Sequence, residues 1–161
     1  MPAYYIGVDL GGTNLRCGVI DENHQIASKY DVPTNAAEGS GAVIERLVES
    51  IQRVLLTDEK EAADIKGIGS GLPGPLNQAR GMVFSAPNMP GWENVPLAEL
   101  IHQRTGIQTF IENDANCAGW GEYVHGAGRG VRHMMMVTLG TGIGGAIIID
   151  GRLHIGRDGA G

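Results

Sequence analysis

The opening of the chain contains three strand-like segments in succession, which limits the folds that it can adopt. These segments span residues 4–9, 15–20 and 25–32, and the last two are separated by the polar stretch 21–24. Strands joined by connections this short pair antiparallel, because a parallel pair needs a crossover of a dozen or more residues. The chain therefore begins with an antiparallel meander and not with a βαβ unit.

The residues that follow alternate between helical and strand-like patterns. Residues 41–56 carry their apolar side chains on one stripe with helical spacing. Further helices are predicted at 96–105 and 114–125, and further strands at 65–70 and 109–112. This order predicts an α/β, ribonuclease-H-like domain whose mixed sheet includes the antiparallel meander.

After about residue 128 the same plan starts again. Residues 133–139 and 145–149 read as two strands around a glycine-rich turn. We therefore expect an N-terminal domain over residues 1–128, and in residues 129–161 the first strands of a second, similar domain.

Composition excludes several classes of protein. The formal net charge of −6 disfavours a nucleic-acid-binding surface, which needs clustered Lys and Arg. No segment is long and apolar enough to span a bilayer, and the start does not resemble a signal peptide, so we expect a cytoplasmic protein. Cys17 and Cys117, in a predicted strand and a predicted helix, are expected to be buried free thiols.

The first glycine turn has the residues of a phosphate cradle. Gly11 and Gly12 let backbone N–H groups face phosphate oxygens without a Cβ in the way. Thr13 and Asn14 add side-chain donors, and Arg16 adds a permanent cation. A plain glycine β-turn remains the alternative, because short glycine motifs are weak evidence taken singly.

A similar turn follows in the second predicted domain. Gly140, Thr141 and Gly142 are the candidates there for holding nucleotide phosphates, with a tight hairpin as the alternative. Asp9, at the end of the first strand, is a candidate for holding hydrated Mg²⁺ through water, or simply satisfies backbone amides.

Asp114 lies at a predicted strand-to-helix junction, where a carboxylate can act as a base. A sugar hydroxyl is a poor nucleophile, and a carboxylate within hydrogen-bond reach can take its proton during phosphoryl transfer. Asn113 is then placed to hold an adjacent hydroxyl, donating and accepting. The alternative is that Asp114 is only a helix N-cap.

Two loops carry the remaining candidates. Gly74 and Asn88 suggest binding of a polyol, with Trp92 as an apolar wall. Simple loop structure explains the same residues equally well.

Four segments in order, at residues 9–16, 85–92, 112–116 and 139–145, resemble the ROK family (repressors, open reading frames and sugar kinases). The resemblance runs over the whole chain, and the segment 85–92 is most similar to that of the family's bacterial glucokinases. It implies an actin-like ATPase fold of two domains with a sugar cleft between them.

That resemblance also implies roles for the candidate residues. Asp114 would be the catalytic base and Asn113 a sugar ligand. The two glycine turns would hold the phosphates of ATP, and transfer of its γ-phosphoryl group requires Mg²⁺. Gly74 and Asn88 would border the sugar. Family members continue with a Glu-x-Gly-His segment and a cysteine-rich zinc site, both absent here, so the chain is expected to be the N-terminal portion of a longer kinase.

The function expected is ATP-dependent phosphorylation of a hexose, most simply glucose, at its 6-hydroxyl. One alternative is the core of a sugar-sensing ROK repressor, although only three residues precede the first strand and the charge is acidic. Another is a non-catalytic fragment that binds sugar or associates with itself, because the strands of an incomplete second domain would expose apolar surface. The sequence does not choose among hexoses.

Overall fold

The computed structural model describes residues 2–87, 89–140 and 142–156, so Asn88 and Thr141 lie outside the described residues. Its largest sheet has five strands in the order β3-β2-β1-β4-β8. The strands are β1 Tyr4–Leu10, β2 Asn14–Ile20, β3 Ile26–Pro33, β4 Ile65–Leu72 and β8 Thr109–Asn113. Strands β1, β2 and β3 pair antiparallel, whereas β4 pairs parallel with both β1 and β8. The predicted mixed sheet with its antiparallel meander is confirmed.

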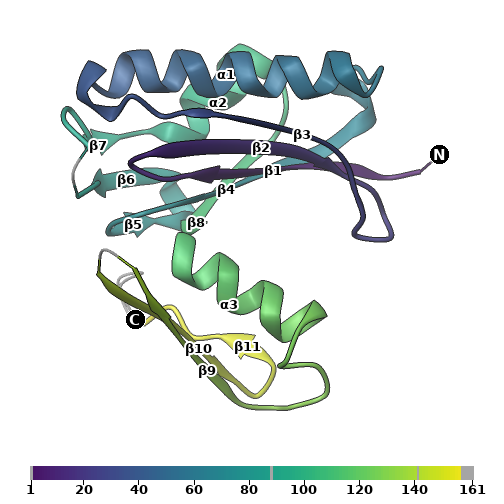
Figure 1. Ribbon diagram of the computed structural model, residues 1–161, viewed down its shortest axis with the longest axis vertical. Helices are drawn as coiled ribbons and strands as arrows, with labels where there is room; N and C mark the ends of the chain where they lie inside the picture. The colour runs from purple at the N-terminus through teal and green to yellow at the C-terminus, as the bar shows by residue number, and fades with distance from the viewer. Residues whose placement is uncertain (1, 88, 141, 157–161) are drawn as a thin grey trace.

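Two helices cover one face of this sheet, α1 Ser40–Thr57 and α2 Leu97–Thr105 (Figure 1). The predicted apolar stripe of α1 is buried from Val43 to Val54 against the strands. Residues of β1 alternate accordingly, because successive side chains on a strand point to opposite faces. Ile6, Val8 and Leu10 point into this core, whereas Tyr5 is 47% exposed on the other face.

A small three-stranded sheet extends this part of the molecule. It consists of β5 Leu76–Asn77, β6 Met82–Ser85 and β7 Glu93–Val95. Strands β5 and β7 are too short to show a period in the sequence. Three short 3₁₀ helices complete this part: η1 Ala36–Glu38, η2 Ala62–Asp64 and η3 Gln78–Arg80.

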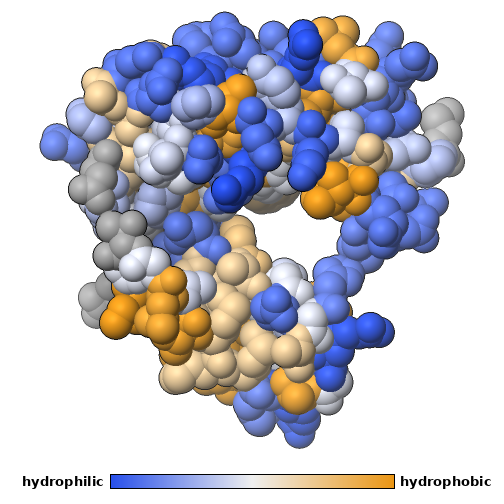
Figure 2. All heavy atoms as spheres, in the orientation of Figure 1, coloured by the Kyte–Doolittle hydropathy of each residue, from blue (hydrophilic) through white to orange (hydrophobic). Residues whose placement is uncertain are grey.

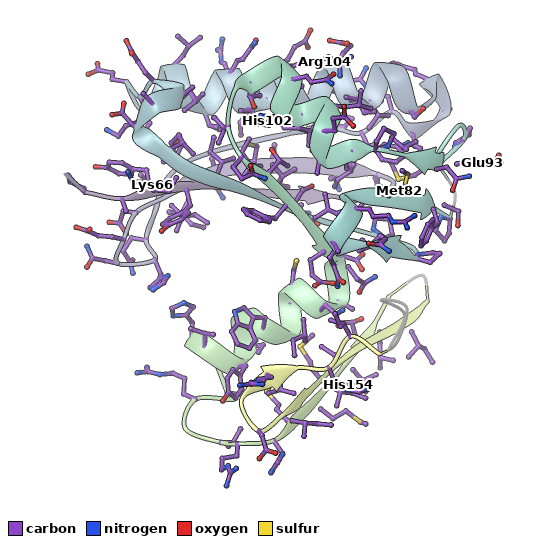
Figure 3. All side chains as sticks on the ribbon, turned by 180° about the vertical axis from the view of Figure 1, so that it is seen from behind. Lys66, Met82, Glu93, His102, Arg104 and His154 are labelled. Carbon is purple, nitrogen blue, oxygen red and sulfur yellow. The ribbon has the colours of Figure 1, made fainter. Side chains whose placement is uncertain are left out.

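The last part of the chain forms a separate layer. Helix α3 Asp114–His125 is followed by an antiparallel sheet of β9 Met134–Leu139, β10 Ile143–Ile149 and β11 Arg152–Leu153. In Figures 1 and 3, α3 lies between this sheet and the five-stranded one. The labelled His154 in Figure 3 lies in this layer, where its N–H donates to the carbonyl of Ile147.

Helix α3 packs closely on β10. A Cβ added to Gly119 would come 2.3 Å from the Cβ of Ala146, so the glycine allows this approach. The boundary expected after residue 128 stays a prediction, and the packing of α3 argues for grouping that helix with the second sheet.

The second sheet leaves one face uncovered among the described residues. The side chains of Met135, Val137 and Leu139 are 70%, 56% and 81% exposed, and Ile143 is 82% exposed. Apolar surface gathers on the lower part of the molecule in Figure 2. The predicted exposure of apolar surface on these strands is confirmed. In the described part of the chain, no helix has the length and apolar character required to cross a membrane.

Candidate functional site

A cavity of 1050 Å³ lies between the two layers, and most of the predicted site residues line it. The wall of the cavity combines both glycine turns, the β8–α3 junction and the loop after β4. The predicted residues that line it are Gly11, Gly12, Thr13, Gly74, Asn113, Asp114, Gly140 and Gly142.

The first glycine turn connects β1 to β2 and is fixed by its own backbone. Gly11 N–H donates to the carbonyl of Asn14 at 2.9 Å, and Thr34 Oγ1 donates to the carbonyl of Gly11 at 2.6 Å. A Cβ on Gly12 would meet nothing within 4 Å. Gly12 therefore faces open space, as the backbone of a phosphate cradle must.

The second glycine turn connects β9 to β10. Gly140 N–H donates to the carbonyl of Gly142 at 2.9 Å, and a Cβ at either glycine would meet nothing within 4 Å. The two turns come from different sheets and line the same cavity.

The β8–α3 junction puts Asn113 and Asp114 in this cavity. Asn113 is the N-cap of α3, because its Oδ1 accepts hydrogen bonds from the backbone N–H groups of Ala115 and Asn116 at 3.0 and 3.2 Å. The alternative reading of Asp114 as the cap is thus wrong, although Asp114 Oδ1 also accepts from Ala115 N–H at 2.8 Å. Asp114 is exposed at the first turn of α3, where the helix dipole stabilises a negative charge.

The capping role changes what Asn113 can offer a ligand. Its Oδ1 already accepts two hydrogen bonds, so only its Nδ2 is free of the cap. The expectation that this amide would both donate to and accept from a sugar hydroxyl is therefore corrected to donation alone.

Gly74 lines the cavity, and its backbone conformation and close neighbours require glycine at this position. Its φ is +97°, and a Cβ there would lie 2.2 Å from the carbonyl oxygen of Ser85. Trp92, predicted as an apolar wall for a polyol, is only 1% exposed and belongs to the core beneath α1 and α2. That interpretation of Trp92 is wrong.

Asp9 and Arg16 lie in an adjoining cavity of 1120 Å³, which shares Asp114 with the first. Arg16 donates to Asp9 Oδ2 at 2.9 Å, and the two side chains are 56% and 53% exposed. Among the described residues there is no group of three or more His, Cys, Asp or Glu side chains that could hold a metal ion. A single half-exposed carboxylate fits a hydrated Mg²⁺ held through water better than direct coordination.

The thiol of Cys117 lies near several carboxylates of this region. Desolvation, and to a lesser extent the carboxylates of Glu112, Asp114 and Asp9, raise its pKa to about 12. Both cysteines are free, as predicted, but only Cys17 is buried; Cys117 is exposed on α3. The surroundings of Cys117 are therefore acidic.

Sequence comparison places this geometry in a known group. The ROK family profile matches residues 5–161. The chain belongs to the ROK family. A glucokinase of Thermotoga maritima is 45% identical over 156 residues, which are 97% of this chain and 48% of that protein.

Solved ROK structures agree with the fold. The crystal structure of a ROK family glucokinase from Streptomyces griseus, in complex with glucose and AMPPNP, matches with a TM-score of 0.85 and 37% identity over 97% of this chain and 47% of that one. A ROK family transcriptional regulator, a homologue of the E. coli MLC protein, has a TM-score of 0.86 at 22% identity over 98% of this chain and 39% of its own, which shows the shared fold alone.

The predicted actin-like ATPase fold of ROK sugar kinases is confirmed. The chain spans about half the length of the curated relatives that it matches.

The site also contains residues that the sequence did not single out. Glu112 and Gln78 form a hydrogen-bonded pair behind Asn113. Thirty-four positions separate them, and nothing in a single sequence marks such a pair.

Proposed function

We propose that this chain forms part of an ATP-dependent hexose kinase that phosphorylates the 6-hydroxyl of glucose. The observation that carries the proposal is that Asp114 and the two glycine turns line one cavity. The glucokinase relatives support glucose over other hexoses. The chain spans about half the length of those relatives, so it is itself a proposal that the chain is active without the remaining half.

In the proposed reaction, ATP supplies the γ-phosphoryl group, and Mg²⁺ offsets the charge of its phosphates. The backbone N–H groups around Gly12 and Gly140 hold phosphate oxygens, and Arg16 adds positive charge nearby. Asp9 would hold the hydrated ion through water.

The hexose lies against the β8–α3 junction. Asn113 donates from Nδ2 to a sugar hydroxyl, which fixes the ring. Gly74 and Asn88 border the sugar. Asp114 accepts the proton of the 6-hydroxyl as the new P–O bond forms.

A coupled assay of ATP-dependent glucose phosphorylation tests the proposal, run on this chain and on its Asp114→Asn variant. Loss of a general base lowers turnover by roughly two to four orders of magnitude while glucose binding persists. Asp150→Asn is the matched control, since Asp150 is exposed in the turn after β10 with a φ of 51°, a conformation that asparagine tolerates.

Turnover that barely changes in Asp114→Asn would refute the assignment of Asp114 as the base. Absence of phosphorylation by the unsubstituted chain, with glucose, fructose or N-acetylmannosamine, would refute the proposed activity for this chain.

A further inference from the structure

Glu112 accepts hydrogen bonds from three different segments beside the site. Gln78 of η3 donates from Nε2 to both carboxylate oxygens, at 2.9 and 2.8 Å. The backbone N–H of Asn113 donates to Oε1 at 2.7 Å, and Asn116 of α3 donates from Nδ2 to Oε1 at 3.0 Å. One half-buried carboxylate thus joins η3, the end of β8 and the first turn of α3.

A carboxylate fits these contacts better than any neutral side chain. An ionised carboxylate only accepts hydrogen bonds, and every group that faces it here is a donor. Hydrogen bonds to a charged acceptor are roughly twice as strong as those between neutral groups. Asn116 is only 3% exposed, so its amide has little access to water as an alternative partner.

The same bonds fix the two residues that face the cavity. Asn113 is held at its backbone N–H by Glu112 and at its side-chain oxygen by Ala115 and Asn116. Asn116 in turn is held by Glu112, which closes a ring of hydrogen bonds around the junction. Within this ring the Asn113 amide keeps Nδ2 free, and Asp114 is the next residue along the chain.

We infer that Glu112 is a positioning residue for this site, with Gln78 as its partner. The pair holds the β8–α3 junction so that the Asn113 amide and the Asp114 carboxylate face the cavity together. The functional role of the pair rests on the proposed function, but the geometry that it holds can be measured independently of that function.

A reciprocal swap that moves the carboxylate from position 112 to position 78 tests the pair. In Glu112→Gln, an amide N–H group replaces one acceptor oxygen and faces the N–H groups of Gln78. In Gln78→Glu, two carboxylates face each other. The double variant reverses donor and acceptor and keeps one oxygen at position 112 for Asn113 and Asn116, so it restores the pair.

The first measurement is hydrogen exchange at the backbone N–H groups of Ala115 and Asn116, which are bonded to Asn113 Oδ1. Asn116 is the decisive position, because Ala115 N–H is also bonded to Asp114 Oδ1. We expect roughly tenfold to a hundredfold faster exchange in each single variant, the scale of a lost charged hydrogen bond, and partial recovery in the double variant, whose position 112 is neutral. Glu99 and Gln103 form the matched control, because their exposed pair on α2 has the same chemistry at 2.9 Å. The same swap there should leave these rates unchanged.

The second measurement is glucose phosphorylation per folded molecule. Misplacement of about an ångström at a reacting group lowers turnover by about a hundredfold. We expect turnover to fall and the KM for glucose to rise in the single variants, with the KM for ATP unchanged and rescue in the double variant. A merely structural role would instead lower the unfolding midpoint and leave turnover per folded molecule unaltered.

Wild-type exchange at Ala115 and Asn116 in both single variants would overturn the inference, and so would a double variant as impaired as the single ones. If the unsubstituted chain phosphorylates no hexose, the proposed function fails. The exchange rates then still decide whether Glu112 holds the junction.

Discussion

The contact between α3 and β10 predicts the outcome of a reciprocal substitution at Gly119 and Ala146. In Gly119→Ala the new Cβ would lie 2.3 Å from the Cβ of Ala146, well inside the ordinary contact of roughly 3.5–4.0 Å between carbon atoms. Helix α3 must therefore move away from the sheet by more than about an ångström.

The expected magnitude follows from two opposed terms. Overpacking of this kind costs up to about 3 kcal/mol, whereas alanine stabilises a helix interior by about 1 kcal/mol relative to glycine. Gly119→Ala should therefore lower the free energy of unfolding by about 2 kcal/mol, which lowers Tm by about 4–8 °C in a chain of this length.

Ala146→Gly in the same chain removes the obstacle. The nearest remaining atom of residue 146 is its Cα, at 3.6 Å from the added Cβ, an ordinary contact. Glycine in a strand costs about 0.5–1 kcal/mol, which the gain in the helix offsets, so the double variant should unfold close to the wild type.

Urea unfolding of the wild type, both single variants and the double variant measures the coupling. We expect the double variant to be more stable than the sum of the single changes by about 3 kcal/mol, the overpacking term that Ala146→Gly removes. Additive effects would show that the two residues do not meet, and the packing of α3 on β10 would then be wrong.

Three further predictions concern the cavity, the uncovered sheet and the buried thiol. Gly12→Val should raise the KM for ATP by at least about tenfold and leave Tm unchanged, because the new side chain enters open space. Gly41→Val, equally unobstructed at the start of α1, is the control. Equal loss of ATP and glucose binding in Gly12→Val would indicate misfolding. Replacing Met135 and Val137 by lysine should reduce self-association measured by sedimentation velocity, and a wild-type chain that stays monomeric at all concentrations would contradict this. Burial raises the pKa of Cys17 from 9.0 to about 12, so between those pH values the unfolded chain releases a proton that the folded chain keeps. The free energy of unfolding therefore falls with rising pH by up to about 1.4 kcal/mol per pH unit. Cys17→Ala should remove this component in urea titrations, and the same pH dependence in both proteins would refute the prediction.

The sequence predicted those parts of the fold that have a clear period or a clear stop. Helix α1 has a full apolar stripe, and its predicted span differs from the observed one by a residue at each end. Helix α3 was predicted over its whole length, since a strand precedes it and a glycine follows it. Strand β5 has two residues, too few for any alternation to appear.

The candidate site was predictable where local motifs carry it. The glycine turns and Asp114 stand out because each sits at the end of a strand. The roles within Asn113-Asp114 were not predictable, because either side chain can cap a helix and only the φ and ψ of Asn113 decide. Gln78 and Glu112 meet through the folding of a loop back onto β8, which is a tertiary contact without a local signal.

The attachment of α3 determines which part of the site moves least. Helix α3 is packed on β9 and β10, but its first residue follows directly from β8 of the five-stranded sheet. A rotation of one layer against the other would therefore swing the far end of α3 and the turn at Gly140, while Asp114 stays near the pivot. On the proposed function, Asp114 would keep its place at the β8–α3 junction while the turn at Gly140 approaches the five-stranded sheet or withdraws from it, so that opening of the cleft need not disturb this junction.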